Sequence, residues 1–268
     1  MALYLIGLGL HDEKDITVRG LEIVRRVKAV YLENYTSVLS CSVERLEDFY
    51  GRKVVVLDRD AVEKGPDEML DQALDGDVAF LVVGDPMGAT THIDLVLRAH
   101  EKGVKVEFIN NASVLTAIGV VGLELYKYGK TTSIVFPQEG WVVDTPYDVI
   151  RQNQEHGLHT LCLLDIKVSE PSKEALRKGG SVTASDPRFM TVNQAIQALL
   201  DIESRRGEKV FTDETLCIGC ARLGSPEPFI RVGKAKDLLG VDFGAPLHSL
   251  IVPGKLHFME EDALRLHK

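Results

Sequence analysis

A carboxylate that directly follows a buried strand is the group in this chain whose position most favours ligand binding. The apolar run Val78–Val83 ends at Gly84-Asp85-Pro86, and Met87-Gly88 comes next. A continuous apolar run between chain breakers is typical of a strand buried on both faces. In open α/β sheets, ligands bind beyond the carboxyl ends of strands. Asp85 is therefore a candidate ligand contact, although it could equally cap the next helix or shape a turn.

Two other apolar strands of the first half end in loops of the same kind. Gly7-Leu8-Gly9-Leu10 ends the first strand, and Asn110–Ser113 follows the strand at Val104–Ile109. If these strands are parallel neighbours, their loops meet at one edge, where Asp85 could accept hydrogen bonds from ribose or amino groups. The helix start after Ser113 could offer backbone N–H groups to a polar ligand. The simpler alternative for Ser113 is an ordinary N-cap.

Several other patterns argue against familiar sites. Gly7-Leu8-Gly9 begins like a dinucleotide fingerprint, but Asp12 stands at the third glycine position and no helix follows at once. Cys217 and Cys220 have redox spacing within an apolar strand, whereas redox pairs lie at helix starts. The sequence contains no HExxH motif and no Cys/His cluster, so we expect no metal site.

Three further residues are interpreted as structural from their spacing alone. His248 opens a strand after a turn, and Leu164 and Leu223 stand at strand ends, where apolar side chains belong to the core. His92 is expected to have a structural role at a helix start.

Composition limits the classes of partner. The chain has 268 residues, 45% of them apolar, and a formal net charge of −9. This charge argues against non-specific nucleic-acid binding, which needs a basic surface. No apolar run approaches the roughly 18–20 residues that span a bilayer, and Met1–Leu10 lacks the basic segment of a secretory signal. We therefore expect a cytoplasmic protein with no membrane contact.

The two halves of the chain have different strand and helix patterns. Strands alternate with helices up to about residue 128, which predicts a mainly parallel sheet flanked by helices. Strands then predominate, which predicts a mixed sheet. We therefore expect two α/β domains, over 1–129 and 130–268. The expected strands are Leu3–Leu8, Ala29–Leu32, Lys53–Leu57, Val78–Val83, Val104–Ile109, Thr131–Phe136, Thr160–Ile166, Thr215–Arg222, Phe229–Val232 and His248–Val252.

Helices are expected between these strands. Thr17 is a plausible N-cap for the first of them, and Ile93, Leu95, Val96 and Leu97 are expected in or near the core. Glu170–Pro187, rich in Gly, Ser, Lys and Pro, predicts a surface loop. The expected helices follow Thr17 and Ser113 and cover Cys41–Tyr50, Pro66–Leu74, Thr91–Lys102, Tyr147–Glu155, Thr191–Ser204 and Glu260–Leu266.

Ordered motifs extend over nearly the whole chain. They are Leu3–Leu10, Asp15–Val18, Tyr31–Thr36, Gly84–His92, His159–Asp165, Met190–Gln194, Glu214–Cys217, Pro246–Ser249 and Leu256–Met259. Together they resemble the diphthine synthase family, which belongs to the tetrapyrrole methylase superfamily of class III S-adenosylmethionine-dependent methyltransferases. Leu10-His11-Asp12 stands where the wider superfamily has Pro-Gly-Asp, which favours the diphthine branch over a porphyrinogen substrate.

The resemblance implies a fold, a reaction and a set of binding residues. It implies two α/β domains with S-adenosylmethionine in the cleft between them, and a homodimer. The methyl acceptor would be the amino group of the 3-amino-3-carboxypropyl side chain on a histidine of elongation factor 2. The implied cofactor contacts are Leu10, Asp85, Gly88, Ser113, Val114, Leu164, Leu223 and His248. For His248, Leu164 and Leu223 this reverses the structural interpretation.

Two other functions and one question stay open at this stage. One alternative is a related methyltransferase acting on a porphyrinogen or precorrin, and the other is a non-catalytic module that binds S-adenosylmethionine. We name no general base. Archaeal-type members transfer three methyl groups and eukaryotic-type members also esterify the carboxylate; Lys255–Arg265 is closer to the archaeal style.

Overall fold

The computed structural model describes residues 1–33, 35, 37–63, 65–137, 143–167 and 187–268. The loop expected at Glu170–Pro187 lies outside this range except for Pro187. The chain forms two compact units, Met1–Ala117 and Ile118–Lys268, which are described separately. The domain boundary after residue 129 stays a prediction.

The first unit is built on an all-parallel five-stranded sheet. Its strand order is β3-β2-β4-β1-β5, so β1 lies between β4 and β5. Every residue of β1 and β4 is buried, as the continuous apolar runs predict. The parallel sheet expected for the first half is confirmed. The strands are β1 (Ala2–Gly7), β2 (Ala29–Glu33), β3 (Val55–Leu57), β4 (Val78–Val82) and β5 (Lys105–Ile109).

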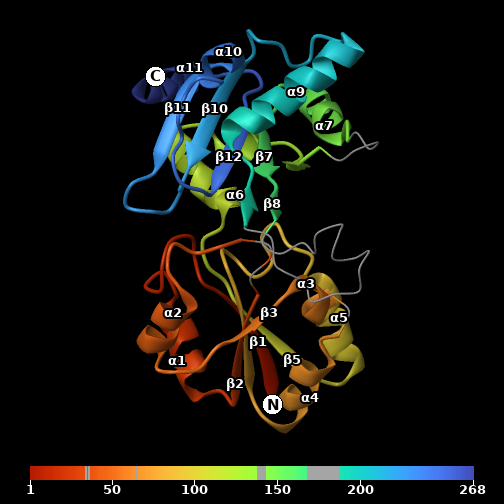
Figure 1. The fold of residues 1–268 in the computed structure, drawn as a ribbon, viewed down its shortest axis with the longest axis vertical. Coiled ribbons are helices and arrows are strands. Elements are labelled where there is room, and N and C mark those ends of the chain that lie inside the picture. The colour runs from red at the N-terminus through yellow and green to blue at the C-terminus, as the bar shows by residue number, and fades with distance from the viewer. Residues whose placement is uncertain (34, 36, 64, 138–142, 168–186) are drawn as a thin grey trace, which may run out of the picture. The chain divides into compact units, whose positions relative to one another are not determined.

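Helices cover both faces of this sheet (Figure 1). Side chains alternate across a strand, so Tyr4 and Ile6 pack with the α1 and α2 side, while Leu3 and Leu5 pack with α4 and α5. Thr17 caps α1, its Oγ1 accepting the N–H of Gly20 at 3.0 Å. The helices are α1 (Val18–Arg26), α2 (Val43–Tyr50), α3 (Arg59–Glu63), α4 (Asp67–Asp75), α5 (Ile93–Glu101) and α6 (Val114–Ala117).

The second unit contains the mixed sheet that its sequence predicts. The strand order is β11-β10-β12-β7-β6; β6 and β7 are parallel, and the other neighbours are antiparallel. A separate pair, β8 with β9, is antiparallel. The strands are β6 (Thr132–Ile134), β7 (Thr160–Leu164), β8 (Ile166–Lys167), β9 (Arg188–Phe189), β10 (Leu216–Ala221), β11 (Phe229–Lys234) and β12 (His248–Val252).

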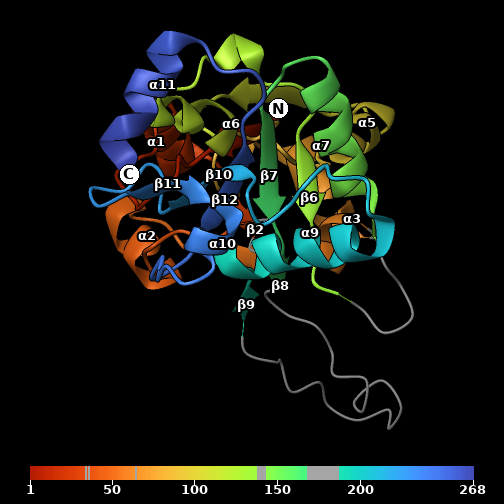
Figure 2. The ribbon, with the colours of Figure 1, turned by 90° about the horizontal axis from the view of Figure 1, so that it is seen from above.

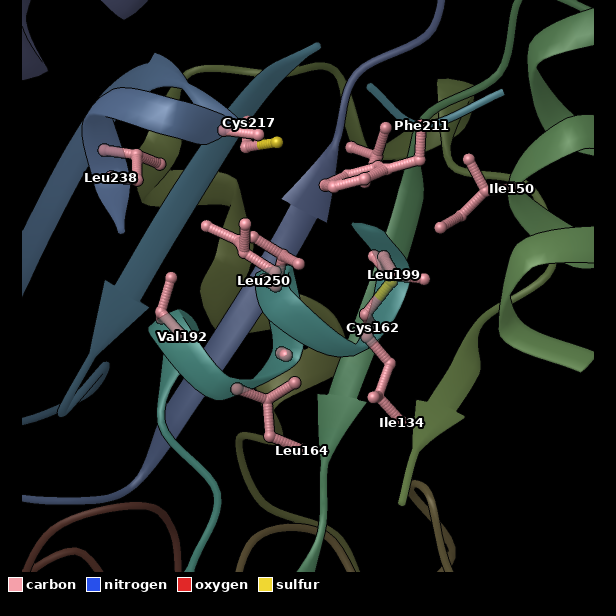
Figure 3. Close-up of a cluster of buried hydrophobic side chains, with 14 of the residues drawn as sticks. Ile134, Ile150, Cys162, Leu164, Val192, Leu199, Phe211, Cys217, Leu238 and Leu250 are labelled. Atoms are coloured by element: carbon pink, nitrogen blue, oxygen red, sulfur yellow. The ribbon is translucent and has the colours of Figure 1, made fainter. Parts of the chain in front are cut away.

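One long helix packs over this sheet (Figure 2). Helix α9 (Val192–Arg206) begins with a capping box between Thr191 and Gln194. Figure 3 shows its Val192 and Leu199 packed with strand residues that include Cys162 and Leu250. The other helices of its described residues are η1 (Ile118–Val121), η2 (Leu125–Lys127), α7 (Thr145–Glu155), α10 (Ala235–Leu238), α11 (Phe258–Leu264) and η3 (Arg265–His267).

A buried carboxylate anchors the C-terminal helix α11. Glu260 is 1% exposed, and its oxygens accept hydrogen bonds from His159 Nε2 at 2.9 Å and Lys127 Nζ at 2.5 Å. The backbone N–H groups of Glu124 and His257 donate to the same carboxylate. Burial raises the pKa of Glu260, but these donors, Lys127 first, outweigh burial and hold the pKa at about 2. The carboxylate is therefore charged and fully paired.

Candidate functional site

The three loops that the sequence singles out do meet at one edge of the parallel sheet. Because β1 lies between β4 and β5, the loops after these strands leave from neighbouring positions. Gly9 donates to the carbonyl of Gly84 at 3.2 Å, and Gly84 donates to that of Gly9 at 2.7 Å. Gly7 is a close-approach position, since a Cβ there would lie 2.6 Å from the Gly84 carbonyl oxygen. The first two loops are thus joined by their backbones.

Asn111 connects the third loop to the other two. Its Nδ2 donates to the carbonyls of Gly7 and Asp15, both at 2.9 Å. Its backbone N–H donates to Oδ2 of Asp85 at 3.1 Å. Asn111 was not predicted as a site residue, although an amide side chain directly after a strand was the available signal.

Asp85 shapes its own turn, which was one of its expected roles, and it also binds the loop after β5. Its Oδ1 accepts the N–H of Met87 at 2.9 Å, and its Oδ2 accepts Asn110 Nδ2 at 3.0 Å besides Asn111 N–H. The residue is half-buried. Since each carboxylate oxygen has more than one lone pair, Asp85 can stabilise two loops and still accept a bond from a ligand.

Gly88 and Ser113 lie against one another beside Asp85. A Cβ on Gly88 would be 3.0 Å from Ser113 Cβ and 3.3 Å from Asp85 Cβ. Ser113 is buried, and its Oγ accepts the N–H of Leu115 at 3.2 Å as α6 begins. Val114, the first residue of α6, is half-buried. A side chain at position 88 would fill space that three predicted site residues share.

Leu10 completes the set in the first unit. It is half-buried, and its N–H donates to Asp15 Oδ2 at 3.1 Å, beside the N–H of His11 at 2.8 Å. Asp15 thus fixes the backbone of this loop at the position where the superfamily pattern changes. His92, expected to be structural, is buried before α5, and its Nδ1 bonds the Pro86 carbonyl at 3.1 Å.

The predicted site residues of the second unit share one edge of the mixed sheet. His248 is paired with Ala221, the last residue of β10, so it lies close to Leu223. Ser249 is paired with Leu163, which places Leu164 beside His248 on the other side. Leu164 is buried and Leu223 is half-buried. Strand pairing brings these three residues together, although they lie far apart in sequence.

Both ring nitrogens of His248 are engaged within the unit. Nε2 lies 3.1 Å from the carbonyl oxygens of Gly244 and Ala245, and Nδ1 accepts the N–H of Val192 at 3.4 Å. The imidazole therefore carries its proton on Nε2. Burial lowers the pKa of His248, against the opposing effect of the two carbonyls. The neutral ring holds the 244–245 turn to the start of α9.

Arg222 holds the same turn from the other side. Its backbone is left-handed, with φ of 54°. Its Nη1 donates to the carbonyls of Phe243 and Ala245 at 2.8 and 2.9 Å. Arg222 and His248 together fix the segment that leads into β12.

The cysteines and possible metal ligands form no reactive cluster in the described chain. No group of three or more His, Cys, Asp or Glu residues there is placed to hold a metal ion. Cys217 and Cys220 are buried free thiols on β10, and burial raises the pKa of Cys220 to about 12. A thiol held in this protonated form is a poor nucleophile. No helix among the described residues combines the length and apolar character needed to cross a bilayer.

Comparison with known proteins places the chain in a family. The family model for tetrapyrrole (corrin/porphyrin) methylases matches residues 2–238. The chain is 54% identical to the diphthine methyl ester synthase of Homo sapiens, across 98% of this chain and 94% of the relative. It is 47% identical to the diphthine synthase of Methanocaldococcus jannaschii, across 98% and 97%. This chain belongs to the diphthine synthase family of tetrapyrrole methylases.

A solved structure agrees with this assignment. The crystal structure of a putative diphthine synthase from Entamoeba histolytica superimposes with a TM-score of 0.89 at 44% identity, covering 100% of this chain and 98% of that one. The probable diphthine methyl ester synthase of Arabidopsis thaliana is 52% identical across 99% of this chain and 98% of the relative. As a member of the diphthine synthase family, the chain is an S-adenosylmethionine-dependent methyltransferase of diphthamide biosynthesis.

Proposed function

We propose that this enzyme methylates the amino group of the 3-amino-3-carboxypropyl side chain on a histidine of elongation factor 2, to give diphthine. The observation that carries the proposal is the full-length similarity to diphthine synthases and diphthine methyl ester synthases. In each transfer the amine lone pair forms an N–C bond to the methyl group. The S–C bond breaks, and its electron pair stays on sulfur in S-adenosylhomocysteine. The amine proton leaves to solvent before attack.

For the cofactor we propose contacts from both units. Leu10, Asp85, Gly88, Ser113 and Val114 belong to the first unit, and Leu164, Leu223 and His248 to the second. The convergence of each set at one sheet edge supports this assignment. The space kept open at Gly88 fits a ligand lying against backbone. His248 would contact the cofactor through its main chain, because its ring nitrogens are engaged elsewhere.

The reaction needs orientation more than acid–base chemistry. Holding two reactants in a near-attack pose contributes roughly 7–11 kcal/mol. An amine whose pKa lies one unit above ambient pH costs only about 1.4 kcal/mol to deprotonate, and desolvation lowers that pKa further. A site that positions the cofactor and excludes water is therefore sufficient, and we assign no general base.

We further propose that a fourth methyl group is transferred to the carboxylate. The methyl ester synthases of Homo sapiens and Arabidopsis thaliana are 54% and 52% identical to this chain, against 47% for the archaeal diphthine synthase. In this step a carboxylate oxygen forms the O–C bond and sulfur again takes the electron pair. The proposed ester runs against Lys255–Arg265, which is closer to the archaeal style. The mass of the product distinguishes three transferred methyl groups from four.

The test is intact-mass analysis of precursor-bearing elongation factor 2 after incubation with this chain and S-adenosylmethionine. Stepwise gain of methyl groups is expected, ending at four, and mild alkaline hydrolysis should then remove one. Three groups that resist hydrolysis would exclude the ester but keep the N-methylation. No mass gain with a competent precursor would exclude the proposal, and methylation of a porphyrinogen instead would favour the tetrapyrrole alternative.

We also propose that the enzyme is a cytoplasmic homodimer. The second unit exposes apolar side chains that a partner could cover, among them Val120 at 62% and Tyr126 at 96%. Light scattering on the purified protein should give twice the chain mass.

The cytoplasmic location has a separate test. Fractionation of the source cells should recover the enzyme in the cytoplasmic fraction.

A further inference from the structure

An exposed arginine lies beside the edge that carries the predicted contacts of the second unit. Arg188 is in β9, opposite Lys167 of β8. Strand β8 begins just after Leu164-Asp165, and the N–H of Met190 donates to the Asp165 carbonyl at 2.9 Å. Arg188 is thus tied by backbone pairing to the end of β7, where Leu164 stands.

The Arg188 guanidinium is held on an aromatic ring. It lies over the ring of Phe136, 4.5 Å from the centroid. Phe136 is itself buried and fixed, because its N–H donates to Asp165 Oδ2 at 2.9 Å. A guanidinium over an aromatic ring has N–H donors at its periphery, where a planar anion can accept two of them.

Among the described residues, Arg188 has a ring contact and no ion pair that uses these donors. The guanidinium of Arg188 is exposed, and no carboxylate of the described residues forms an ion pair with it. Arg222, at the same sheet edge, already donates to the carbonyls of Phe243, Ala245 and Glu227. The protein is acidic, with a net charge of −9. A guanidinium that is held on a ring and has no ion-pair partner among the described residues is a candidate to bind an anion.

We propose that Arg188 binds the carboxylate of an α-amino acid moiety through a bidentate pair. The proposal rests on the proposed function, because that reaction brings two such moieties to the enzyme. One is the methionine part of S-adenosylmethionine, and the other is the 3-amino-3-carboxypropyl group of the acceptor. Both offer the same chemistry to the guanidinium, so the experiment has one arm for each.

The experiment compares Arg188→Gln and Arg188→Lys with Arg231→Gln. Arg231 is an exposed arginine of β11, away from the predicted contacts, and serves as the matched control. Calorimetry measures the Kd of S-adenosylmethionine and of its decarboxylated form, and initial rates give KM and kcat for precursor-bearing elongation factor 2. A charged bidentate pair corresponds to about tenfold or more in affinity. Arg188→Lys should bind more tightly than Arg188→Gln but less tightly than the wild type, since lysine keeps the positive charge and lacks the paired N–H donors of the guanidinium.

Each result decides the proposal. If the carboxylate is the cofactor's, Arg188→Gln weakens S-adenosylmethionine about tenfold and leaves the decarboxylated form unchanged. If it is the acceptor's, cofactor Kd is unchanged and KM for the acceptor rises about tenfold with kcat less affected. Equal weakening of both cofactor forms, or values equal to those of Arg231→Gln, would overturn it. If wild-type enzyme leaves the acceptor unmethylated, the proposed function fails first; the cofactor arm then decides alone, and an unchanged Kd overturns this proposal too.

Discussion

Asn111 and Asp85 are joined by a backbone-to-carboxylate hydrogen bond of 3.1 Å, which connects the loops after β5 and β4, the two strands that flank β1. The amide of Asn111 extends this connection to Gly7 and Asp15. A ligand that touches these loops therefore meets a preassembled surface. Ordering it beforehand removes part of the entropy cost of binding.

Asn111→Ala is expected to loosen this surface. The substitution leaves the carbonyls of Gly7 and Asp15 without their side-chain donor, which should cost about 1–3 kcal/mol in the free energy of unfolding. Kd for S-adenosylmethionine should rise about tenfold. Urea unfolding and calorimetry measure the two effects. Asn110→Ala is the control, since it removes a single exposed bond to Asp85; equal effects in both variants would contradict the role given to Asn111.

Asp85→Ala tests the residue with which the sequence argument began. From sequence alone we expect weaker cofactor binding and an intact fold. The structure adds that the carboxylate holds three donors, so unfolding should also become easier by about 1–2 kcal/mol. Calorimetry on folded protein, confirmed by circular dichroism, separates the two effects. Unchanged Kd would leave Asp85 with the turn-shaping role alone.

Gly88→Ala probes the space beside Ser113. The new Cβ would lie 3.0 Å from Ser113 Cβ, closer than most real contacts, so the neighbour must shift. We expect about tenfold weaker cofactor binding and a loss of about 1 kcal/mol in stability. Gly240→Ala is the matched control, because nothing lies within 4 Å of a Cβ at that position. A Kd equal to that of the control would contradict the placement of a ligand against Gly88.

The lowered pKa of His248 predicts that the protein loses stability in mild acid. Burial lowers its pKa from the ordinary value of 6.5, so the folded state binds a proton less readily than the unfolded chain. The contribution of neutral His248 to the free energy of unfolding is complete above pH 6.5. It is lost as the pH falls through the lowered pKa of the folded state. Protonated Nδ1 would also oppose the N–H of Val192. Urea unfolding between about pH 8 and pH 5 should show a smaller pH dependence in His248→Gln; part remains, because burial also lowers the pKa of His159.

Glu260→Gln should be strongly destabilising. It leaves the Lys127 ammonium beside a neutral amide, and breaking a largely buried pair costs about 2–4 kcal/mol. The wild-type carboxylate, held at a pKa of about 2 instead of 4.5, contributes stability above pH 4.5 that is lost as pH falls toward 2. Thermal unfolding at neutral pH measures the first effect. Glu261→Gln, an exposed neighbour, should change Tm little.

Local patterns were sufficient to predict the main elements. The buried run at Val78–Val83 and the Thr17 cap are visible in adjacent residues, and the parallel direction of the strands in the first sheet follows from their alternation with helices. Short elements without a full period, such as α3 and α10, were missed. Of the four residues of α5 expected in or near the core, Leu95 is buried, but Ile93 and Leu97 were wrongly placed, since they are 55% and 57% exposed.

Partners of polar side chains could not be predicted, because they depend on distant pairing. Asn111 donates to Gly7 across more than a hundred residues, and the sequence around either residue does not identify the other as its partner. The edge shared by Leu164 and His248 exists only because β7 pairs with β12. Sequence spacing shows that His248 opens a strand, but the proton on Nε2 follows from the Gly244 and Ala245 carbonyls.

The Glu260 anchor has a consequence for the order in which the protein matures on the ribosome. Lys127 and His159 are synthesised 133 and 101 residues before the carboxylate that pairs with them. The first unit, complete at Ala117, can fold while the rest emerges. The second unit must wait for α11, and until then the His159 ring and the Lys127 ammonium lack the carboxylate that accepts their hydrogen bonds. We expect nascent chains stalled before α11 to be the form that chaperones and proteases recognise.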